Sequence, residues 1–252
     1  MYIDTHCHIY QEYYDDIDKE INDCNKENCN VLITNGCDLK SSKESLEIAK
    51  KYKEVYAAIG FHPTEIKDYD DSWLSWLKEH INDDKVVAIG EIGLDYHYDD
   101  TDKEKEIIIF KKQLELAEKY QMPVIVHSRD ATEDTLKILK DYNLKGIIHG
   151  FSGSLEVAKE YIKMGYKLGV NGVVTFKNAH LKEVIKEIGI KNIVIETDSP
   201  YLTPDPFRGQ KNHPYNVKII VDFLADYLNI SKEEILRITN NNAKEILQKL
   251  KM

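Results

Sequence analysis

Arginine is scarce in this sequence. Of the 34 lysines and arginines, only Arg129, Arg208 and Arg237 are arginines. The formal net charge of −10 argues against broad electrostatic attraction to nucleic acid, although bound divalent cations can reverse the charge locally. Where lysine is the usual cation, an arginine is expected at positions that need its planar, two-pronged donor group. Arg129 and Arg208 are therefore candidates for phosphate contacts, with an ion pair to Asp130 or Asp134 as the alternative for Arg129.

Cysteine is also rare, and it is confined to one end of the chain. All 4 cysteines lie within the first 37 residues, and the pair Cys24 and Cys29 has no second pair to complete a zinc site. Reduced structural thiols are therefore expected, which is typical of a cytoplasmic protein. No apolar run approaches the length of a membrane span, and Asp4 and His6 interrupt the N-terminus too early for a signal peptide. We expect a cytoplasmic protein with no membrane association and no obligate protein partner.

Low-complexity stretches, tandem repeats and linkers are absent from the sequence. Hydrophobic residues make up 42% of the chain and charged residues 31%, a balance that suits a folded chain with a sizeable core. Because no shift of composition divides the 252 residues, we expect one domain over residues 1–252.

Eight short apolar segments alternate with segments of helical pattern. Strands are expected at 2–6, 30–35, 55–59, 85–89, 123–126, 146–148, 166–170 and 192–195. Helices are expected at 17–28, 42–52, from 72 onward, 103–120, 131–142, 155–164, 181–188 and 216–228, and then from Ser231 to a break at Asn240–Asn242 before a last short helix. This alternation predicts an α/β fold, a (β/α)8 TIM barrel with a C-terminal helical extension. An open doubly wound sheet is the alternative, disfavoured because no glycine-rich phosphate loop follows the first strand.

Histidines and carboxylates gather where the predicted strands end, which is where barrels carry their chemistry. His6 and His8 point to one face of the first strand, and Cys7 between them points to the other. The later strands end in His62, Glu91, His127, His149 and Asp198. Imidazoles with two carboxylates suit zinc, manganese or similar ions, while magnesium prefers more oxygen ligands. Six ligands are too many for one tetrahedral site and suit two divalent ions that share a carboxylate.

Two carboxylates have distinct expected roles. Glu91, from the middle of the ligand order, is the candidate bridge between two ions, and Asp198 is the ligand expected to take a proton from the attacking water. Asp95 is expected either to support the metal ligands or to cap its own loop. Phe61, Tyr96 and Tyr201 are expected either to stack on bases or to pack against the barrel.

The sequence resembles the TatD family of metal-dependent deoxyribonucleases, among the amidohydrolase-like barrels, over nearly its whole length. The matching stretches are Asp4-Thr5-His6-Cys7-His8, Gly60-Phe61-His62-Pro63, residues 90–96, residues 123–131, His149-Gly150-Phe151-Ser152-Gly153 and residues 196–202, with Pro204, Arg208-Gly209 and Asn212-His213-Pro214 beyond them.

The resemblance implies a DNA substrate, single-stranded or with free 3′ ends, cleaved as a 3′–5′ exonuclease by a metal-activated water. It implies that two divalent ions (zinc, manganese or magnesium) are held by His6, His8, Glu91, His127, His149 and Asp198. Asp198, Glu91 and His62 are the expected catalytic residues, and His62, Arg129 and Arg208 the expected substrate-binding residues. Many relatives have His-Pro-His where this chain has His62-Pro63-Thr64, so substrate handling is expected to differ at Thr64.

Two other functions compete with a nuclease. A D-aminoacyl-tRNA deacylase, or another ester or amide hydrolase, could use the same binuclear site. Many amidohydrolases bridge their ions with a carboxylated lysine at the end of strand four, and Glu91 at that position favours phosphodiester chemistry. A non-enzymatic metal-binding protein is disfavoured, because a structural site would be closed by four ligands.

Overall fold

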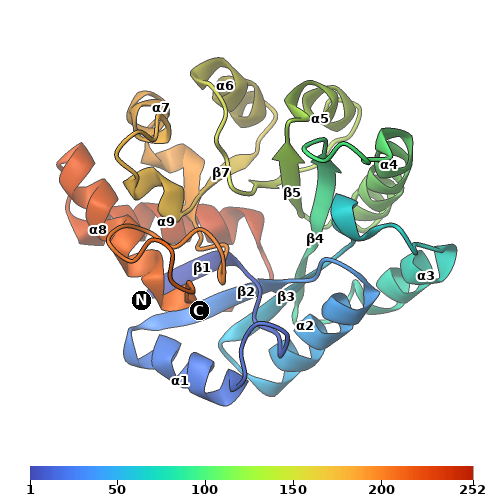
Figure 1. Ribbon diagram of the computed structural model, residues 1–252, viewed down its shortest axis with the longest axis horizontal. Coiled ribbons are helices and arrows are strands. Elements are labelled where there is room, and N and C mark those ends of the chain that lie inside the picture. The colour runs from blue at the N-terminus through green and yellow to red at the C-terminus, as the bar shows by residue number, and fades with distance from the viewer. Residues whose placement is uncertain (252) are drawn as a thin grey trace.

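The computed structural model describes residues 1–251. Within them, eight parallel strands pair in chain order. They are β1 (Tyr2–Cys7), β2 (Cys29–Asn35), β3 (Val55–Ile59), β4 (Val86–Asp95), β5 (Val124–Arg129), β6 (Gly146–Ile148), β7 (Lys167–Val170) and β8 (Ile193–Ile195). Figure 1 shows the helices arranged in a ring around these strands.

The helices between the strands are α1 (Ile17–Lys26), α2 (Leu39–Lys51), α3 (Asp71–His80), α4 (Lys103–Tyr120), α5 (Thr132–Leu139), α6 (Leu155–Lys163) and α7 (Leu181–Ile188). Two more, α8 (Val217–Leu228) and α9 (Lys232–Ile246), follow β8. An aspartate caps the N-terminus of each of α1, α2, α3 and α4 by accepting from a backbone N–H of its first turn. No helix among residues 1–251 is long and apolar enough to cross a membrane.

The seam between the first and last strands completes the barrel. The Asp198 N–H donates to the His6 carbonyl at 2.9 Å, and the His8 N–H donates to the Ser199 carbonyl at 2.8 Å. Cys7 and Ser199 form a parallel bridge between these bonds. The predicted (β/α)8 barrel with a C-terminal helical extension is therefore confirmed, and the open sheet is excluded.

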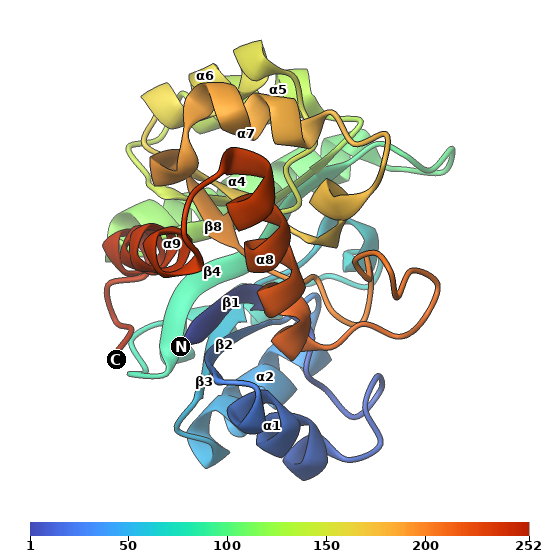
Figure 2. The same ribbon diagram turned by 90° about the vertical axis from the view of Figure 1, so that its left-hand side faces the viewer.

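The two ends of the barrel differ in character. At one end, apolar side chains of the strands, such as Ile33 and Ile147, form a cluster with Ala243, Ile246 and Leu247 from the α9 region. Figure 2 shows α9 and both termini at this end, while the loops that follow β1, β4 and β8 extend from the other. Helix α9 therefore covers the apolar end of the barrel. The polar side chains at the strands' carboxyl ends lie at the opposite end, which carries the loops.

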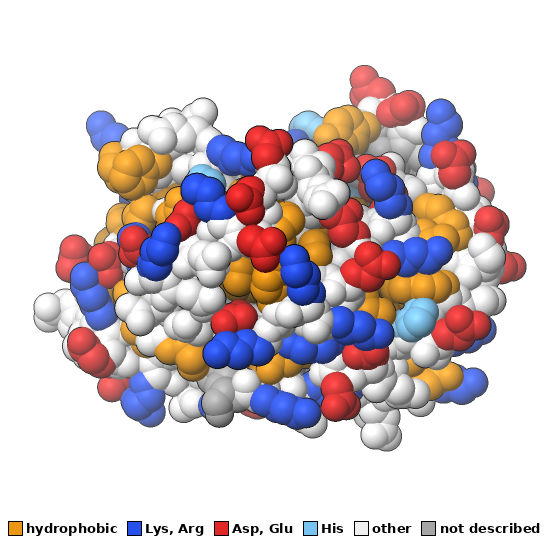
Figure 3. Space-filling view, turned by 90° about the horizontal axis from the view of Figure 1, so that it is seen from below, with side chains coloured by type: hydrophobic (Ala, Val, Ile, Leu, Met, Phe, Trp, Pro, Cys, Tyr) orange, Lys and Arg blue, Asp and Glu red, His pale blue; other side chains and the backbone are white. Residues whose placement is uncertain are grey.

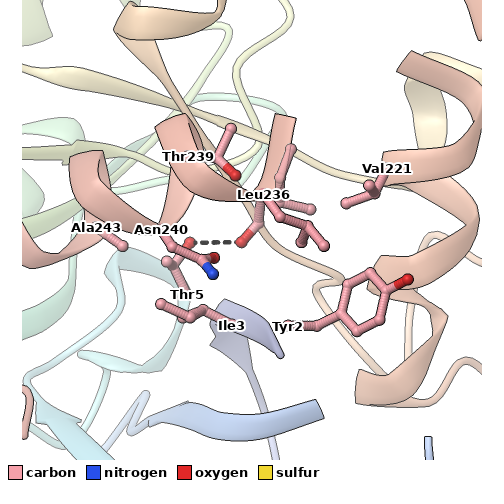
Figure 4. Close-up of a pocket in the computed structure, with 9 residues that line it drawn as sticks. Tyr2, Ile3, Thr5, Val221, Leu236, Thr239, Asn240 and Ala243 are labelled. Atoms are coloured by element: carbon pink, nitrogen blue, oxygen red, sulfur yellow. Dashed lines mark hydrogen bonds between the residues drawn. The ribbon is translucent and has the colours of Figure 1, made fainter. Parts of the chain in front are cut away.

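The break predicted at Asn240–Asn242 is wrong, because α9 runs through it without interruption. The buried Asn242 side-chain amide donates to the carbonyls of Ile190 at 2.9 Å and Ile193 at 2.7 Å, and Asn240 donates to the Met1 carbonyl at 3.1 Å. Figure 4 shows Asn240 beside a cavity of about 10 Å³ between α8, α9 and β1. These tertiary contacts override the low helix propensity of asparagine.

Strand β4 is longer than predicted, so Glu91 lies within it and Asp95 at its end. Its second half pairs with β5, where Gly93 lies opposite His127. A Cβ atom at Gly93 would lie 1.9 Å from the His127 carbonyl oxygen, and the residue has a φ of +149°. Only glycine fits this close approach. The extended pairing fixes Glu91 and His127 relative to each other.

Candidate metal centre

The Glu91 carboxylate stands in the middle of the histidines. Its Oε2 lies 3.2 Å from His6 Nε2 and 3.7 Å from His8 Nε2. Its Oε1 lies 3.0 Å from His127 Nδ1 and 3.7 Å from His149 Nε2. The two oxygens therefore face two different sets of imidazoles, which is the geometry expected of a carboxylate between two cations.

The first set fits a cation closely. It consists of His6 Nε2, His8 Nε2, Glu91 Oε2 and Asp198 Oδ1, and five of the distances among these atoms fall between 3.2 and 3.7 Å. Ligand atoms placed tetrahedrally about 2.1 Å from a zinc ion lie about 3.4 Å apart. Five of the six separations among these atoms thus match those expected around one divalent ion.

The second set is looser. Atoms of Glu91, His127 and His149 lie within 4.8 Å of one another, and His149 Nε2 is also 3.8 Å from Asp198 Oδ1. The structure therefore brings together all six residues that the sequence predicted as ligands. Their donor set of imidazoles and two carboxylates suits zinc or manganese.

The charges of the cluster also suit cations. Burial alone would raise the pKa of Glu91, but the surrounding histidines, His6 foremost, hold it well below its usual value. The pKa of Asp198 is lowered in the same way, because His149 and His8 outweigh its burial. Neither carboxylate forms an ion pair with a lysine or arginine in the part of the chain that the structure describes. Both carboxylates are ionised at neutral pH, and their charged neighbours are the histidines of the cluster.

Carboxylates behind the ligands orient two of the histidines. Asp95 Oδ2 lies 3.1 Å from His127 Nε2, and Asp95 Oδ1 accepts the His97 N–H at 3.0 Å. Both roles expected for Asp95 are thus present. Glu196 Oε1 lies 2.9 Å from His149 Nδ1. Such carboxylate contacts fix the ring orientation of metal-ligating histidines.

The sequence patterns did not indicate that Glu196 orients His149 or that Gly169 makes room for Glu196. A Cβ atom at Gly169 would lie 2.2 Å from Glu196 Oε2, so the glycine makes room for the buried carboxylate. The one available signal was a second acidic residue two positions before Asp198 at the end of an apolar strand.

Asp4 and Tyr10 position the histidines of the first strand. Asp4 accepts the His6 N–H at 3.1 Å and the Thr197 N–H at 2.9 Å, which ties β1 to the segment that carries Asp198. His8 Nδ1 lies 2.6 Å from the Tyr10 hydroxyl. Cys7 turns away, with its thiol 3.3 Å from the Ile33 carbonyl, as the strand alternation predicted.

His62 lies beside the cluster, with its Nε2 3.5 Å from Glu91 Oε1. Its Nδ1 accepts the Thr64 N–H at 3.2 Å and lies 2.8 Å from the Thr64 hydroxyl. Burial and the neighbouring His127 lower the pKa of His62 to about 3, so the ring is neutral. Because Nδ1 accepts a hydrogen bond, Nε2 carries the proton and points into the site.

The arginines lie farther out. The Arg129 guanidinium is 5.7 Å from the centre of the Tyr98 ring, and that of Arg208 is 4.3 Å from the centre of the Phe176 ring. Within residues 1–251, Arg129 pairs with neither Asp130 nor Asp134, since Asp130 contacts His97 and Asp134 accepts from Tyr96. Both arginines are exposed and have donors available to an anionic ligand.

The three aromatic candidates for base stacking differ in their surroundings. Phe61 is buried with its ring centre 4.9 Å from that of Trp73, so the packing alternative holds for it and stacking on a base is excluded. The Tyr96 hydroxyl donates to Asp134 at 2.9 Å, which holds that ring against the barrel. Tyr201 is 49% exposed and remains free to contact a ligand.

Comparisons with known proteins identify the family of this chain. The sequence model of the family described as TatD related DNase matches residues 3–248. The uncharacterized metal-dependent hydrolase YabD of Bacillus subtilis is 43% identical over 98% of this chain and 99% of its own length. The uncharacterized metal-dependent hydrolase YjjV of Escherichia coli is 32% identical over 96% of this chain and 95% of its own length.

Solved structures show the same likeness. The crystal structure of YjjV, a TatD homologue from Escherichia coli, superposes with a TM-score of 0.93 at 30% identity and covers 98% of each chain. A TatD family hydrolase from Entamoeba histolytica superposes with a TM-score of 0.86 at 27% identity over 99% of this chain and 98% of its own. With its ligand cluster at the loop-bearing end of the barrel, the chain belongs to the TatD-related DNase family of metal-dependent hydrolases.

Proposed function

We propose that this protein hydrolyses DNA phosphodiester bonds from the 3′ end of a single strand, with two divalent cations at the Glu91 cluster. The observation that carries the proposal is the division of the Glu91 carboxylate between two ligand sets. Two cations so placed would offset the charge of a phosphate and lower the pKa of a water molecule. The family description as a DNase supports DNA as the substrate.

Other steps of the reaction are assigned to individual side chains around the cations. Asp198 is anionic, and its Oδ1 lies 3.3 Å from His8 Nε2, so it can orient the attacking water and accept its proton. His62 presents a neutral Nε2–H beside Glu91 and can donate to a phosphate oxygen or to the leaving oxygen. Arg129 and Arg208 can bind phosphates farther along the strand.

Local contacts must attract the polyanion, because the surface as a whole does not. In the face shown in Figure 3, acidic and basic side chains are interspersed without a large patch of one sign. With a net charge of −10, long-range attraction to DNA is weak. Binding should therefore depend on the cations and on the residues around the barrel mouth.

The test compares wild type with Glu91→Gln on single-stranded DNA labelled at the 3′ end, with zinc, manganese or magnesium added. Glu12→Gln, at an exposed position, is the matched control. Wild type and the control should release labelled nucleotides, and Glu91→Gln should lose activity by at least 100-fold, as expected for loss of a central charged group. A parallel reaction with a D-aminoacyl-tRNA separates the rival hydrolase. Turnover of that ester alone, or of neither substrate, would contradict the proposal.

A further inference from the structure

Two tyrosines form a wall at one side of the ligand cluster. Tyr13 comes from the loop after β1 and Tyr201 from the loop after β8, and their hydroxyls are 2.8 Å apart. Their ring centres are 5.7 Å apart and lie 6.5 and 6.3 Å from the His8 ring, respectively. The pair therefore stands next to a predicted metal ligand although its members are far apart in the chain.

The loop that carries Tyr201 has several large apolar side chains that are unusually exposed to solvent. Tyr201, Leu202 and Phe207 are 49%, 40% and 45% exposed, respectively. Arg208, in the same loop, lies over the Phe176 ring. Apolar rings interleaved with cations are what single-stranded nucleic acid binds, because bases stack on rings while phosphates pair with cations.

The loop is held in place before any ligand binds. The Tyr201 N–H donates to the Asp198 carbonyl at 2.8 Å, so the backbone that carries the ring is tied to a residue of the cluster, and the ring's hydroxyl is held by Tyr13. The buried Asn212 amide donates to the carbonyls of Tyr201 at 2.7 Å and Thr197 at 3.1 Å. The Tyr14 hydroxyl donates to the Asn212 carbonyl at 2.8 Å. A fixed ring loses little freedom when a base stacks on it.

We propose that Tyr201, backed by Tyr13, is the stacking surface for the nucleobase of the nucleotide whose phosphate is cleaved. The inference rests on the proposed function and adds a determinant of substrate choice. The terminal base of a duplex is held by its pairing partner and must be unpaired before it can turn onto the ring, whereas the terminal base of a single strand is free to do so. A stacking surface beside the cluster therefore selects single-stranded ends over paired ones.

The test uses Tyr201→Ala and Tyr201→Phe, with Tyr227→Ala as the matched control. Tyr227 is 37% exposed on α8 and stacks on Phe223, away from the ligand cluster. With normal single-stranded DNA, Tyr201→Ala should lower kcat/KM roughly 5- to 150-fold, the range measured for loss of one stacked base. Tyr201→Phe keeps the ring and should stay within about threefold of wild type, as should Tyr227→Ala.

A DNA whose 3′-terminal nucleotide lacks its base isolates the stacking contribution. Tyr201→Ala and wild type should cleave this DNA equally, because there is no base to stack. A 2-aminopurine base at the 3′ end of a DNA whose terminal linkage is a non-hydrolysable phosphodiester analogue, mixed with metal-loaded protein, gives a second readout. Its fluorescence should be quenched by wild type and Tyr201→Phe, and not by Tyr201→Ala.

The outcomes separate the two proposals. If wild type cleaves no DNA, the proposed function fails whatever Tyr201 does. If wild type cleaves DNA and Tyr201→Ala loses as much activity on the abasic end as on the normal end, the tyrosine only packs the loop and the stacking inference is overturned. Equal quenching of 2-aminopurine by all three proteins would overturn it as well.

Discussion

Asp95 offers a way to weaken one of the two predicted cation sites without touching the other. The buried carboxylate uses both oxygens, one for His127 Nε2 at 3.1 Å and one for the His97 N–H at 3.0 Å. When His127 Nδ1 binds a cation, Nε2 carries the proton and needs an acceptor. The side-chain amide that Asp95→Asn introduces has one acceptor oxygen for two N–H donors and no charge, so His127 loses its fixed orientation or His97 its partner.

The magnitude follows from the type of contact. Loss of a carboxylate behind a metal-ligating histidine costs about 10- to 100-fold in metal affinity, or about 1.4–2.8 kcal/mol. The loss should appear only at the site of Glu91, His127 and His149. Asp95 makes no hydrogen bond or ion pair with His6, His8 or Asp198 among the described residues, so the other site should keep its affinity.

Calorimetric titration with manganese measures both sites of the same protein. Asp130→Asn is the matched control, since Asp130 is exposed and contacts His97 but not His127. His127→Ala should abolish binding at the site that Asp95→Asn weakens. Equal weakening of both sites by Asp95→Asn, or no weakening of either, would refute the assignment of His127 and Asp95 to one cation.

Three further substitutions test the fold and the site. Asn242→Ala leaves two buried carbonyls without donors and should lower the free energy of unfolding by about 2–4 kcal/mol in urea, against less than about 0.5 kcal/mol for the exposed Asn241→Ala. Burial raises the pKa of Glu106 from 4.5 to about 7, so its contribution to stability is full below pH 4.5 and is lost as the pH rises toward 7. In metal-free protein, Glu106→Gln should make the fall in the free energy of unfolding over this pH range smaller by about 1–3 kcal/mol. An unchanged pH dependence of the free energy of unfolding would contradict this expectation. Thr64→Val keeps the N–H bond to His62 but removes the hydroxyl, and should lower kcat about 3- to 10-fold with unchanged manganese affinity by calorimetry.

The clustering of the six candidate ligand residues could be predicted because their positions follow from local rules. Side chains alternate along a strand, so His6 and His8 must share a face, and the barrel gathers the carboxyl ends of all its strands. Both rules can be applied without information on which strands pair with each other. The same reasoning placed Glu91 and His127 on neighbouring strands, although the carboxyl ends of both β4 and β5 lie farther along the chain than predicted.

The supporting residues could not be predicted in this way. Asp4 meets Thr197 across 193 positions, and Glu196 meets Gly150 across 46. Burying a carboxylate in an apolar strand costs free energy, and only a hydrogen-bonding partner offsets that cost. Such a residue therefore cannot be explained until its partner is known. The uninterrupted α9 is the same kind of case, since Asn242 is stabilised by carbonyls that lie about 50 positions earlier in the chain.

The two ligand sets differ in how they depend on the fold. The second set comes from β4, β5 and the end of β6, which are neighbours in sequence and in the sheet. The first set joins His6 and His8 from the start of the chain to Asp198 near its end, across the seam that Asp4 and Thr197 hold together. A cation held by the first set would crosslink β1 and the segment after β8, and its binding free energy would add to the stability of the closed barrel. Opening of the seam would abolish the first site while leaving the elements of the second in contact.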